Sequence, residues 1–293
     1  MKQHPWQGAI WVGLTVFLLL GLTYVYLPTL TWLGGEWLGS GSFAGPVRDW
    51  SHGPLVLVLV SYLVWRRRGR LSLNRDPFAG LPVIMGAVGL YLTSVLLEAP
   101  YLSAYSLILT ALGFLCLFCG RGAGFRLLIP LGLFALAVPF PATQWGITGF
   151  LAQVVAIASA SLARLAGAPV YRSGQLITVG QDEYLVEPLC SGFNFIMALL
   201  ALVMPLLCLR GASFKSLGGA LLWAPALALA AKIALVSTIL VLTPVVGQDV
   251  ALRLYHGWVG ITFFLGSLGA ALIVINGMPR MSFMRSLPLP QLR

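Results

Sequence analysis

The feature that most constrains this chain is a series of long apolar stretches separated by short polar loops. A helix needs about 20 apolar residues to cross a bilayer. Only 9% of the 293 residues are charged, whereas a soluble domain carries about 25%. The sequence therefore predicts an all-α polytopic membrane protein with about eight transmembrane helices, in the stretches Ala9–Pro28, Pro54–Trp65, Leu81–Leu97, Leu102–Phe118, Leu127–Phe140, Ser191–Leu209, Leu217–Leu242 and Gly257–Asn276.

The distribution of charge predicts the topology. Lysine and arginine concentrate in alternate loops, around Arg66–Arg70, Arg121–Arg126 and Arg210–Lys215 and after Arg280, whereas most acids lie in the other loops. Because cytoplasmic loops are enriched in basic residues, we expect a multi-pass membrane protein with both termini in the cytoplasm. These basic loops account for the net charge of +10. The expected partner is therefore the lipid bilayer, and no nucleic acid is expected.

This topology holds only if the helical stretch Thr143–Leu165 does not cross the membrane. We expect there an interfacial or re-entrant helix on the outer face. The alternative is that this stretch spans and a neighbouring short stretch does not. Residues 1–276 are predicted to form one integral-membrane domain, and residues 277–293 a basic cytoplasmic tail.

One outer segment has the alternation typical of strands. Residues 171–186 alternate around Gly174 and Gly180, which predicts a small β-hairpin on the outer face. The hairpin leads into Glu187 and then Cys190, the only cysteine expected on that side. A thiol where a helix begins has its thiolate stabilised by unpaired N–H groups. Two interpretations of Cys190 stay open here, a structural cysteine and a nucleophile.

Two histidines are expected on the same face as Cys190. His52 precedes the second stretch and His256 the eighth, and a cysteine with a histidine is the minimum apparatus for a thiol nucleophile. The alternative is that both histidines are incidental neighbours of the aromatic residues Trp50, Tyr255 and Trp258 at the membrane interface. No spacing resembles zinc ligation, so no metal and no cofactor are expected.

Lys232 is the one charged residue expected inside a span. Its burial near the centre of a helix costs at least about 2.5–3.5 kcal/mol, which by default indicates a functional residue. The expected helix ends about ten residues later, so the ammonium would snorkel outward toward the outer face. Arg253 is a second outer cation that could serve similarly. The alternative is that Lys232 pairs with a carbonyl for packing alone.

Several short motifs, in this order and spacing, resemble the exosortase/archaeosortase family. They cover most of the chain and are Ser51-His52-Gly53-Pro54, Tyr62-Leu63-Val64-Trp65 before Arg66-Arg67-Arg68, Phe140-Pro141, Gly167-Ala168-Pro169-Val170-Tyr171-Arg172-Ser173-Gly174, Val186-Glu187-Pro188-Leu189-Cys190-Ser191-Gly192 and His256-Gly257-Trp258. The chain departs from the family at two positions. Lys232 stands where the family typically has arginine, and Asn194 stands where it often does.

The resemblance implies a membrane cysteine protease or transpeptidase at the periplasmic face of the bacterial inner membrane. Its partners would be exported proteins with a C-terminal sorting tail, made of a proline-containing motif, a transmembrane helix and a basic cluster. Cys190 would be the nucleophile and His256 the acid/base, with Lys232 as the cation. Arg253, Asn194, Glu187 and His52 would support them. The alternative is a catalytically impaired relative that acts as a scaffold or component of surface polysaccharide or protein export.

Overall fold

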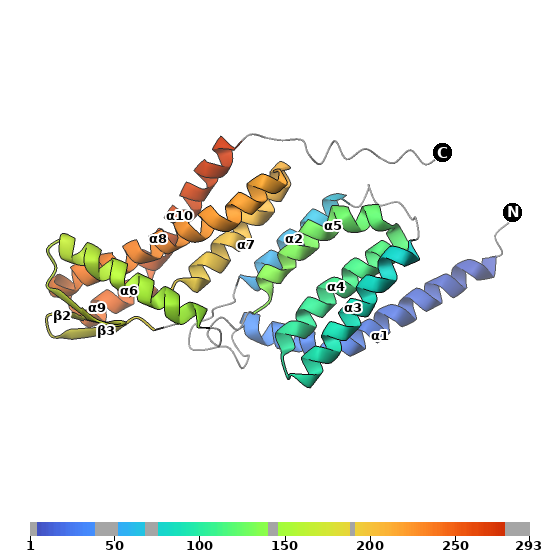
Figure 1. Cartoon of the computed structure of the whole chain (residues 1–293), viewed down its shortest axis with the longest axis horizontal. Coiled ribbons are helices and arrows are strands. Elements are labelled where there is room, and N and C mark those ends of the chain that lie inside the picture. The colour runs from blue at the N-terminus through green and yellow to red at the C-terminus, as the bar shows by residue number, and fades with distance from the viewer. Residues whose placement is uncertain (1–4, 39–51, 68–75, 140–145, 188–190, 279–293) are drawn as a thin grey trace. The chain divides into compact units, whose positions relative to one another are not determined.

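The computed structural model describes residues 5–38, 52–67, 76–139, 146–187 and 191–278. Within these ranges, the side chains of residues 5–19, Arg67, Pro77, Phe214 and His256 are not described. The chain divides into two compact units, residues 1–54 with 66–139 and residues 55–65 with 140–293. The elements are α1 (Pro5–Leu38), α2 (Gly53–Arg67), α3 (Pro77–Leu96), α4 (Pro100–Cys119), α5 (Arg121–Leu133), η2 (Phe134–Ala137), α6 (Ile147–Leu165), β1 (Val170–Ser173), β2 (Leu176–Val179), β3 (Asp182–Leu185), α7 (Phe193–Arg210), α8 (Phe214–Val246), α9 (Gln248–His256) and α10 (Trp258–Gly277) (Figure 1).

The first unit is built around α3 and α4, which lie side by side (Figure 1). Asp76 caps α3 by accepting a bond from the Ala79 amide at 3.1 Å. Glycines let the two backbones approach closely, because a Cβ on Gly80 would lie 2.7 Å from the Leu117 Cα and one on Gly113 would lie 2.6 Å from an Ile84 side-chain carbon. Close approach at small residues is how helices associate inside a bilayer, where no hydrophobic effect drives them together.

The exposed side chains of α3 are those expected of a helix in contact with lipid. It presents a continuous exposed apolar stripe at helical spacing, made of Phe78, Leu81, Met85, Val88, Leu92 and Val95. Six such exposed positions in one 20-residue helix would form a large apolar patch in water. In lipid this surface is the expected one, because the backbone is satisfied within the helix and the side chains contact acyl chains. The stripe therefore marks a membrane-facing helix.

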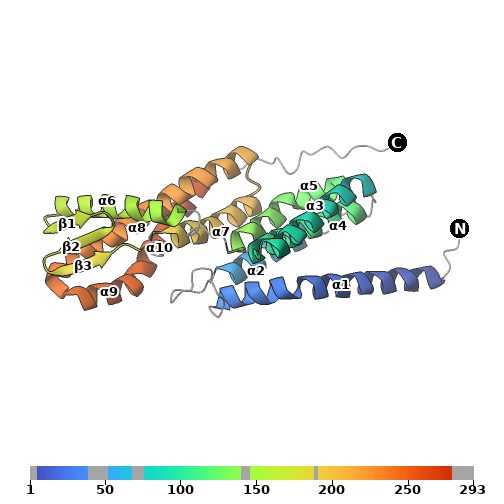
Figure 2. The ribbon, with the colours of Figure 1, turned by 60° about the horizontal axis from the view of Figure 1, so that its bottom comes forward.

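The second unit surrounds α8, which at 33 residues is the longest helix described in it. The first part of α8 pairs with α7, and the later part packs against α6 and α9 (Figure 2). A cluster of buried residues joins α6, the sheet and α8, namely Ala152, Val155, Ala156, Ala160, Ala163, Ile177, Val179, Val186, Val236 and Leu240. The alanines of α6 keep its distance from α8 short.

Residues 170–185 form a three-stranded antiparallel sheet of order β1-β2-β3 rather than the small hairpin expected. Ser173 pairs with Leu176 across the first turn, and Val179 pairs with Asp182 across the second. Gly174 and Gly180 begin these two-residue turns with φ of 64° and 65°. Tight hairpin turns require this positive φ, which glycine adopts without steric cost. Both glycines expected to mark turns therefore do so.

In the part of the chain that the structure describes, the architecture is that of an all-α polytopic membrane protein with this one small sheet. Within the described ranges, six helical segments are long and apolar enough to cross a membrane: Phe78–Leu96, Pro100–Cys119, Ile147–Leu165, Phe193–Arg210, Lys215–Val246 and Gln248–Gly277. The expected span Leu127–Phe140 is interrupted, because α5 ends at Leu133 and continues as the short 3₁₀ helix η2. The total of eight spans stays a prediction, as does the interfacial position of Thr143–Leu165, since α6 is itself long enough to span.

Candidate active site

Lys232 is buried where α7, α8 and α9 meet, with only 7% of its surface exposed. Its Nζ donates a hydrogen bond to the Tyr255 Oη at 2.5 Å. The same ammonium lies 4.7 Å from the centre of the Tyr255 ring and 5.3 Å from that of Phe195. A cation within about 6 Å of an aromatic ring centre is attracted to it, most strongly where water is excluded. The protein thus holds this charge between two aromatic rings and a hydroxyl group.

Gly192 joins Lys232 to the start of α7. It is the residue preceding α7, with φ of 89° and ψ of 1°. A Cβ built on Gly192 would lie 2.9 Å from the Cγ and 3.2 Å from the Cβ of Lys232. The position therefore demands glycine twice, for its left-handed backbone and for the space that the lysine stem occupies. Ser191, directly before it, is fully buried.

Three segments distant in sequence converge at Lys232. They are the residues that follow Cys190, the middle of α8, and the end of α9, where Tyr255 directly precedes His256. Cys190 itself lies outside the described residues, and so does the side chain of His256. Contact between the sulfur of Cys190 and the imidazole of His256 therefore stays a prediction.

Lys232 also lies at a defined depth along its helix. It is 18 residues beyond the start of α8, which corresponds to about 27 Å of helix. Helix α7 has 18 residues and therefore about the same length, so Gly192 and Lys232 lie level at the same end of the α7–α8 pair. Helix α8 continues for 14 residues to Val246, further than the sequence indicated. Lys232 is thus near one end of the paired segment rather than near the end of its helix.

The supporting residues occupy varied surroundings. Glu187 is exposed just after the sheet, and Asn194 is half-buried in the first turn of α7. Arg253 is exposed on α9, and its Nε donates to the Asp249 carbonyl at 3.3 Å. Its described bond is thus local to α9. The role of each in chemistry stays a prediction.

His52 belongs to the first unit and has a structural contact there. Its Nε2 lies 3.1 Å from the Leu136 carbonyl oxygen. Because a carbonyl only accepts, Nε2 carries the proton. The Trp37 indole N–H similarly donates to the Ala137 carbonyl at 2.9 Å. Burial lowers the pKa of His52 from its ordinary value of 6.5, partly opposed by the bond to Leu136. The two side chains therefore satisfy the carbonyls of η2, and His52 is held in its neutral form.

Sequence reasoning missed Tyr255 and Phe195 as partners of the buried cation. Tyr255 was assigned only to the aromatic belt, and Phe195 was not singled out. The available signal was weak, namely that a tyrosine directly precedes His256 and an aromatic residue follows Gly192 by three positions. Among the described residues, no group of three or more His, Cys, Asp or Glu is arranged to hold a metal ion.

Comparison with known proteins identifies the family. Residues 46–273 match the transmembrane exosortase family. No curated protein and no solved structure was found to match. Because the match covers more than three quarters of the chain and includes Lys232, Tyr255 and His256, the chain belongs to the transmembrane exosortase family. The resemblance stated from its motifs is thereby confirmed.

Replacing Gly192 with alanine should damage the site more than the same change at Gly146. Both glycines precede a helix with positive φ, of 89° and 69°, but a Cβ on Gly146 would meet nothing within 4 Å. Gly146→Ala should cost about 1–2 kcal/mol for the left-handed backbone. Gly192→Ala should cost about 1–3 kcal/mol more, because the Lys232 stem must move. Thermal unfolding of both variants in detergent measures the difference, and equal losses would contradict the packing of Lys232 on Gly192.

Acidification should destabilise the protein partly through His52. Because folding lowers the pKa of this side chain, the unfolded chain binds its proton more readily. Its neutral form is fully favoured above the unfolded pKa of about 6.5, and stability is lost as pH falls below that value. His52→Gln keeps an N–H donor without titrating. The melting temperature of the variant, compared at pH 7.5 and 5.5, should fall less than that of the native protein, and an identical fall would rule out this contribution.

Proposed function

We propose that this protein is a membrane cysteine protease or transpeptidase that cleaves C-terminal sorting tails of exported proteins at the outer face of the bacterial inner membrane. The observation that carries the proposal is the contact of buried Lys232 with both Gly192 and Tyr255. These residues adjoin the two groups required for thiol chemistry, Cys190 and His256. Consecutive Cα atoms are about 3.8 Å apart, so two covalent steps leave Cys190 within about 8 Å of Gly192.

The reaction assigns one role to each group. His256 takes the proton of the Cys190 thiol, and the sulfur attacks the scissile carbonyl carbon to form a tetrahedral oxyanion. Lys232 stabilises the negative charge on that oxygen. When the intermediate collapses, the C–N bond breaks, and His256 returns the proton to the departing amine. The resulting thioester at Cys190 is released by water or by an acceptor amine.

The surroundings of Lys232 suit this role. Lysine is a compact point charge on a flexible stem, whereas arginine presents a rigid bidentate fork. Packing on Gly192 and the bond to Tyr255 restrict the flexible stem. An ammonium in a water-poor site stabilises a nearby anion more strongly than it would in bulk water. Lysine in place of the family's arginine therefore keeps the positive charge. The rings of Tyr255 and Phe195 and the Tyr255 hydroxyl, rather than a rigid guanidinium, fix its position.

The proposed location follows from helix lengths and loop charge. Arg210 and Lys215 lie at the connection between α7 and α8, and basic loops face the cytoplasm. The site is about 27 Å along the helices from that connection, and the hydrocarbon core is about 30 Å thick. Lys232 would therefore lie at the outer boundary of the bilayer. The later half of α8, with α6, α9 and the sheet, would project from the span toward the periplasm.

Loss of the thiol should abolish processing. In cells that carry a substrate with a sorting tail, Cys190→Ala should leave the full-length substrate uncleaved, because no other group in the proposed mechanism forms the thioester. Cys119→Ala, a change at a half-buried thiol in α4, is the matched control and should process normally. The measurement is the ratio of full-length to cleaved substrate by immunoblot. Continued cleavage with Cys190→Ala would contradict the proposal and favour a scaffold role.

Removing the charge of Lys232 should slow the thiol itself. A nearby cation lowers the pKa of a cysteine and raises its thiolate fraction at mildly acidic pH. Alkylation of Cys190 by iodoacetamide at pH 6 should therefore slow by about tenfold or more in Lys232→Met. Lys232→Arg restores the charge and should recover most of the rate. Equal alkylation rates in all three proteins would show that Lys232 does not act on Cys190.

A further inference from the structure

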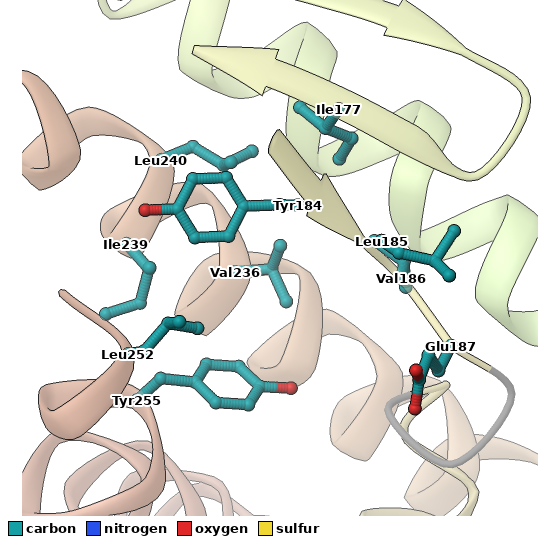
Figure 3. A pocket seen from close by; sticks show the side chains of 10 residues that line it. All are labelled: Ile177, Tyr184, Leu185, Val186, Glu187, Val236, Ile239, Leu240, Leu252 and Tyr255. Carbon is teal, nitrogen blue, oxygen red and sulfur yellow. The ribbon is translucent and has the colours of Figure 1, made fainter. Parts of the chain in front are cut away.

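An apolar pocket lies beside the Lys232 site, on the side of the sheet. It encloses about 200 Å³ and is lined by Ile177, Tyr184, Leu185, Val186, Glu187, Val236, Ile239, Leu240, Leu252 and Tyr255. Figure 3 shows these side chains between the sheet, α8 and α9, with Glu187 at one end. The Tyr255 hydroxyl points toward the end where Glu187 lies (Figure 3). The pocket and the buried cation therefore share Tyr255 as a common wall.

The size and lining of the pocket restrict what can occupy it. Sites for whole small molecules usually measure about 300–1,000 Å³, whereas an apolar cavity of about 150 Å³ already accommodates a benzene ring. A volume of about 200 Å³ therefore suits one aliphatic side chain. The Tyr184 hydroxyl is directed to the Thr243 Oγ1, 2.8 Å away. An ionised side chain would find few partners in this lining, because most of the groups are aliphatic.

The position of the pocket relative to the cation suggests which part of a peptide would enter it. Val236, Ile239 and Leu240 follow Lys232 by four to eight residues on α8, which is about 6–12 Å further from the basic α7–α8 connection. A sorting tail has its transmembrane helix after the scissile bond. Residues before that bond therefore lie on the periplasmic side, where this pocket would be.

The neighbouring strand edge is a weaker candidate for holding a peptide. Strand β3 is at the edge of the sheet, where an added strand could pair with it. However, the Gln248 side chain donates to the Glu183 carbonyl at 3.0 Å, and the Glu187 amide donates to the Leu185 carbonyl at 3.0 Å. Two outward acceptors of β3 are thus already occupied. Side-chain recognition in the pocket remains the better-supported mode.

We propose that this pocket is a specificity site, which accepts an uncharged aliphatic side chain of the substrate on the amino-terminal side of the scissile bond. The inference rests on the proposed function, because it assigns part of the same substrate. Tyr255 connects the two sites, since the residue that forms the pocket wall also holds the Lys232 ammonium. A fitting side chain would position the adjacent carbonyl beside the cation. Glu187 at the rim disfavours an acidic side chain by charge repulsion.

The test uses the full chain in lipid nanodiscs and reagents that alkylate cysteine. The probes are acetyl-tripeptidyl chloromethyl ketones in which either of the two residues nearest the ketone is glycine, leucine or aspartate. The thiolate displaces chloride, and mass spectrometry measures the rate at Cys190. Iodoacetamide, which has no peptide, reports the reactivity of the thiol alone. In one of the two series, leucine should react about tenfold or more faster than glycine, and aspartate should react slowest.

Matched variants on α9 assign the effect to the pocket. Leu252 lines the pocket and is 37% exposed, whereas Val250 is 41% exposed on the same helix and does not line it. Leu252→Trp should remove the advantage of leucine over glycine, and Val250→Trp should retain it. Leu185→Trp alters a second exposed lining residue, on β3. It should have the same effect as Leu252→Trp and replaces that variant if the latter does not fold.

Each outcome separates the two proposals. If iodoacetamide labels Cys190 normally while leucine and glycine reagents react equally, the pocket proposal is overturned and the proposed function stands. The pocket proposal is also overturned if leucine keeps its advantage in both Leu252→Trp and Leu185→Trp. If neither iodoacetamide nor any peptide reagent labels Cys190, the proposed function fails and the specificity site fails with it.

Discussion

The second unit depends on the burial of one charge. Lys232 places an ammonium among apolar helices, where an unsatisfied cation would be strongly destabilising. The Tyr255 hydroxyl and the rings of Tyr255 and Phe195 compensate this cost. Each belongs to a different helix from the lysine. The requirement to satisfy one cation therefore fixes the start of α7 and the end of α9 against the middle of α8.

The length of α8 explains how one helix can pair with α7 and also support the sheet. A helix of about 20 residues crosses the hydrocarbon core, and α8 has 33. Its first part pairs with α7, and its later part carries a buried cluster shared with α6 and the sheet. Gly247, with φ of 81°, then ends α8 and lets α9 fold back on it. One continuous helix thus links the buried cation to the pocket, so the two have a fixed spacing.

The pattern of apolar residues along the sequence predicted most of the helices but not the contacts between them. Apolar stretches of about 20 residues identified the segments of α3, α4, α7, α8 and α10 to within a few residues. The interruption after Leu133 was missed, because hydropathy does not report where a helix tightens into a 3₁₀ turn. The third strand was missed, because the alternation over residues 171–186 was interpreted as one small hairpin, whereas the segment forms three strands. The exposed glycine turns were predicted, because their backbone requirement is local.

The candidate site likewise has features that the sequence could predict and contacts that it could not. The expectation that Lys232 has a function could be drawn from the cost of a charge in an apolar stretch, which depends only on the residue and its neighbours in the sequence. The bond of Lys232 to Tyr255 could not be predicted, because 23 intervening residues and a helix reversal determine whether the two meet. The contact of Gly192 with the lysine stem is likewise invisible without packing. This contact gives the glycine after Cys190-Ser191 a physical role: any larger residue would displace the cation from the helix start on which the proposed thiol chemistry depends.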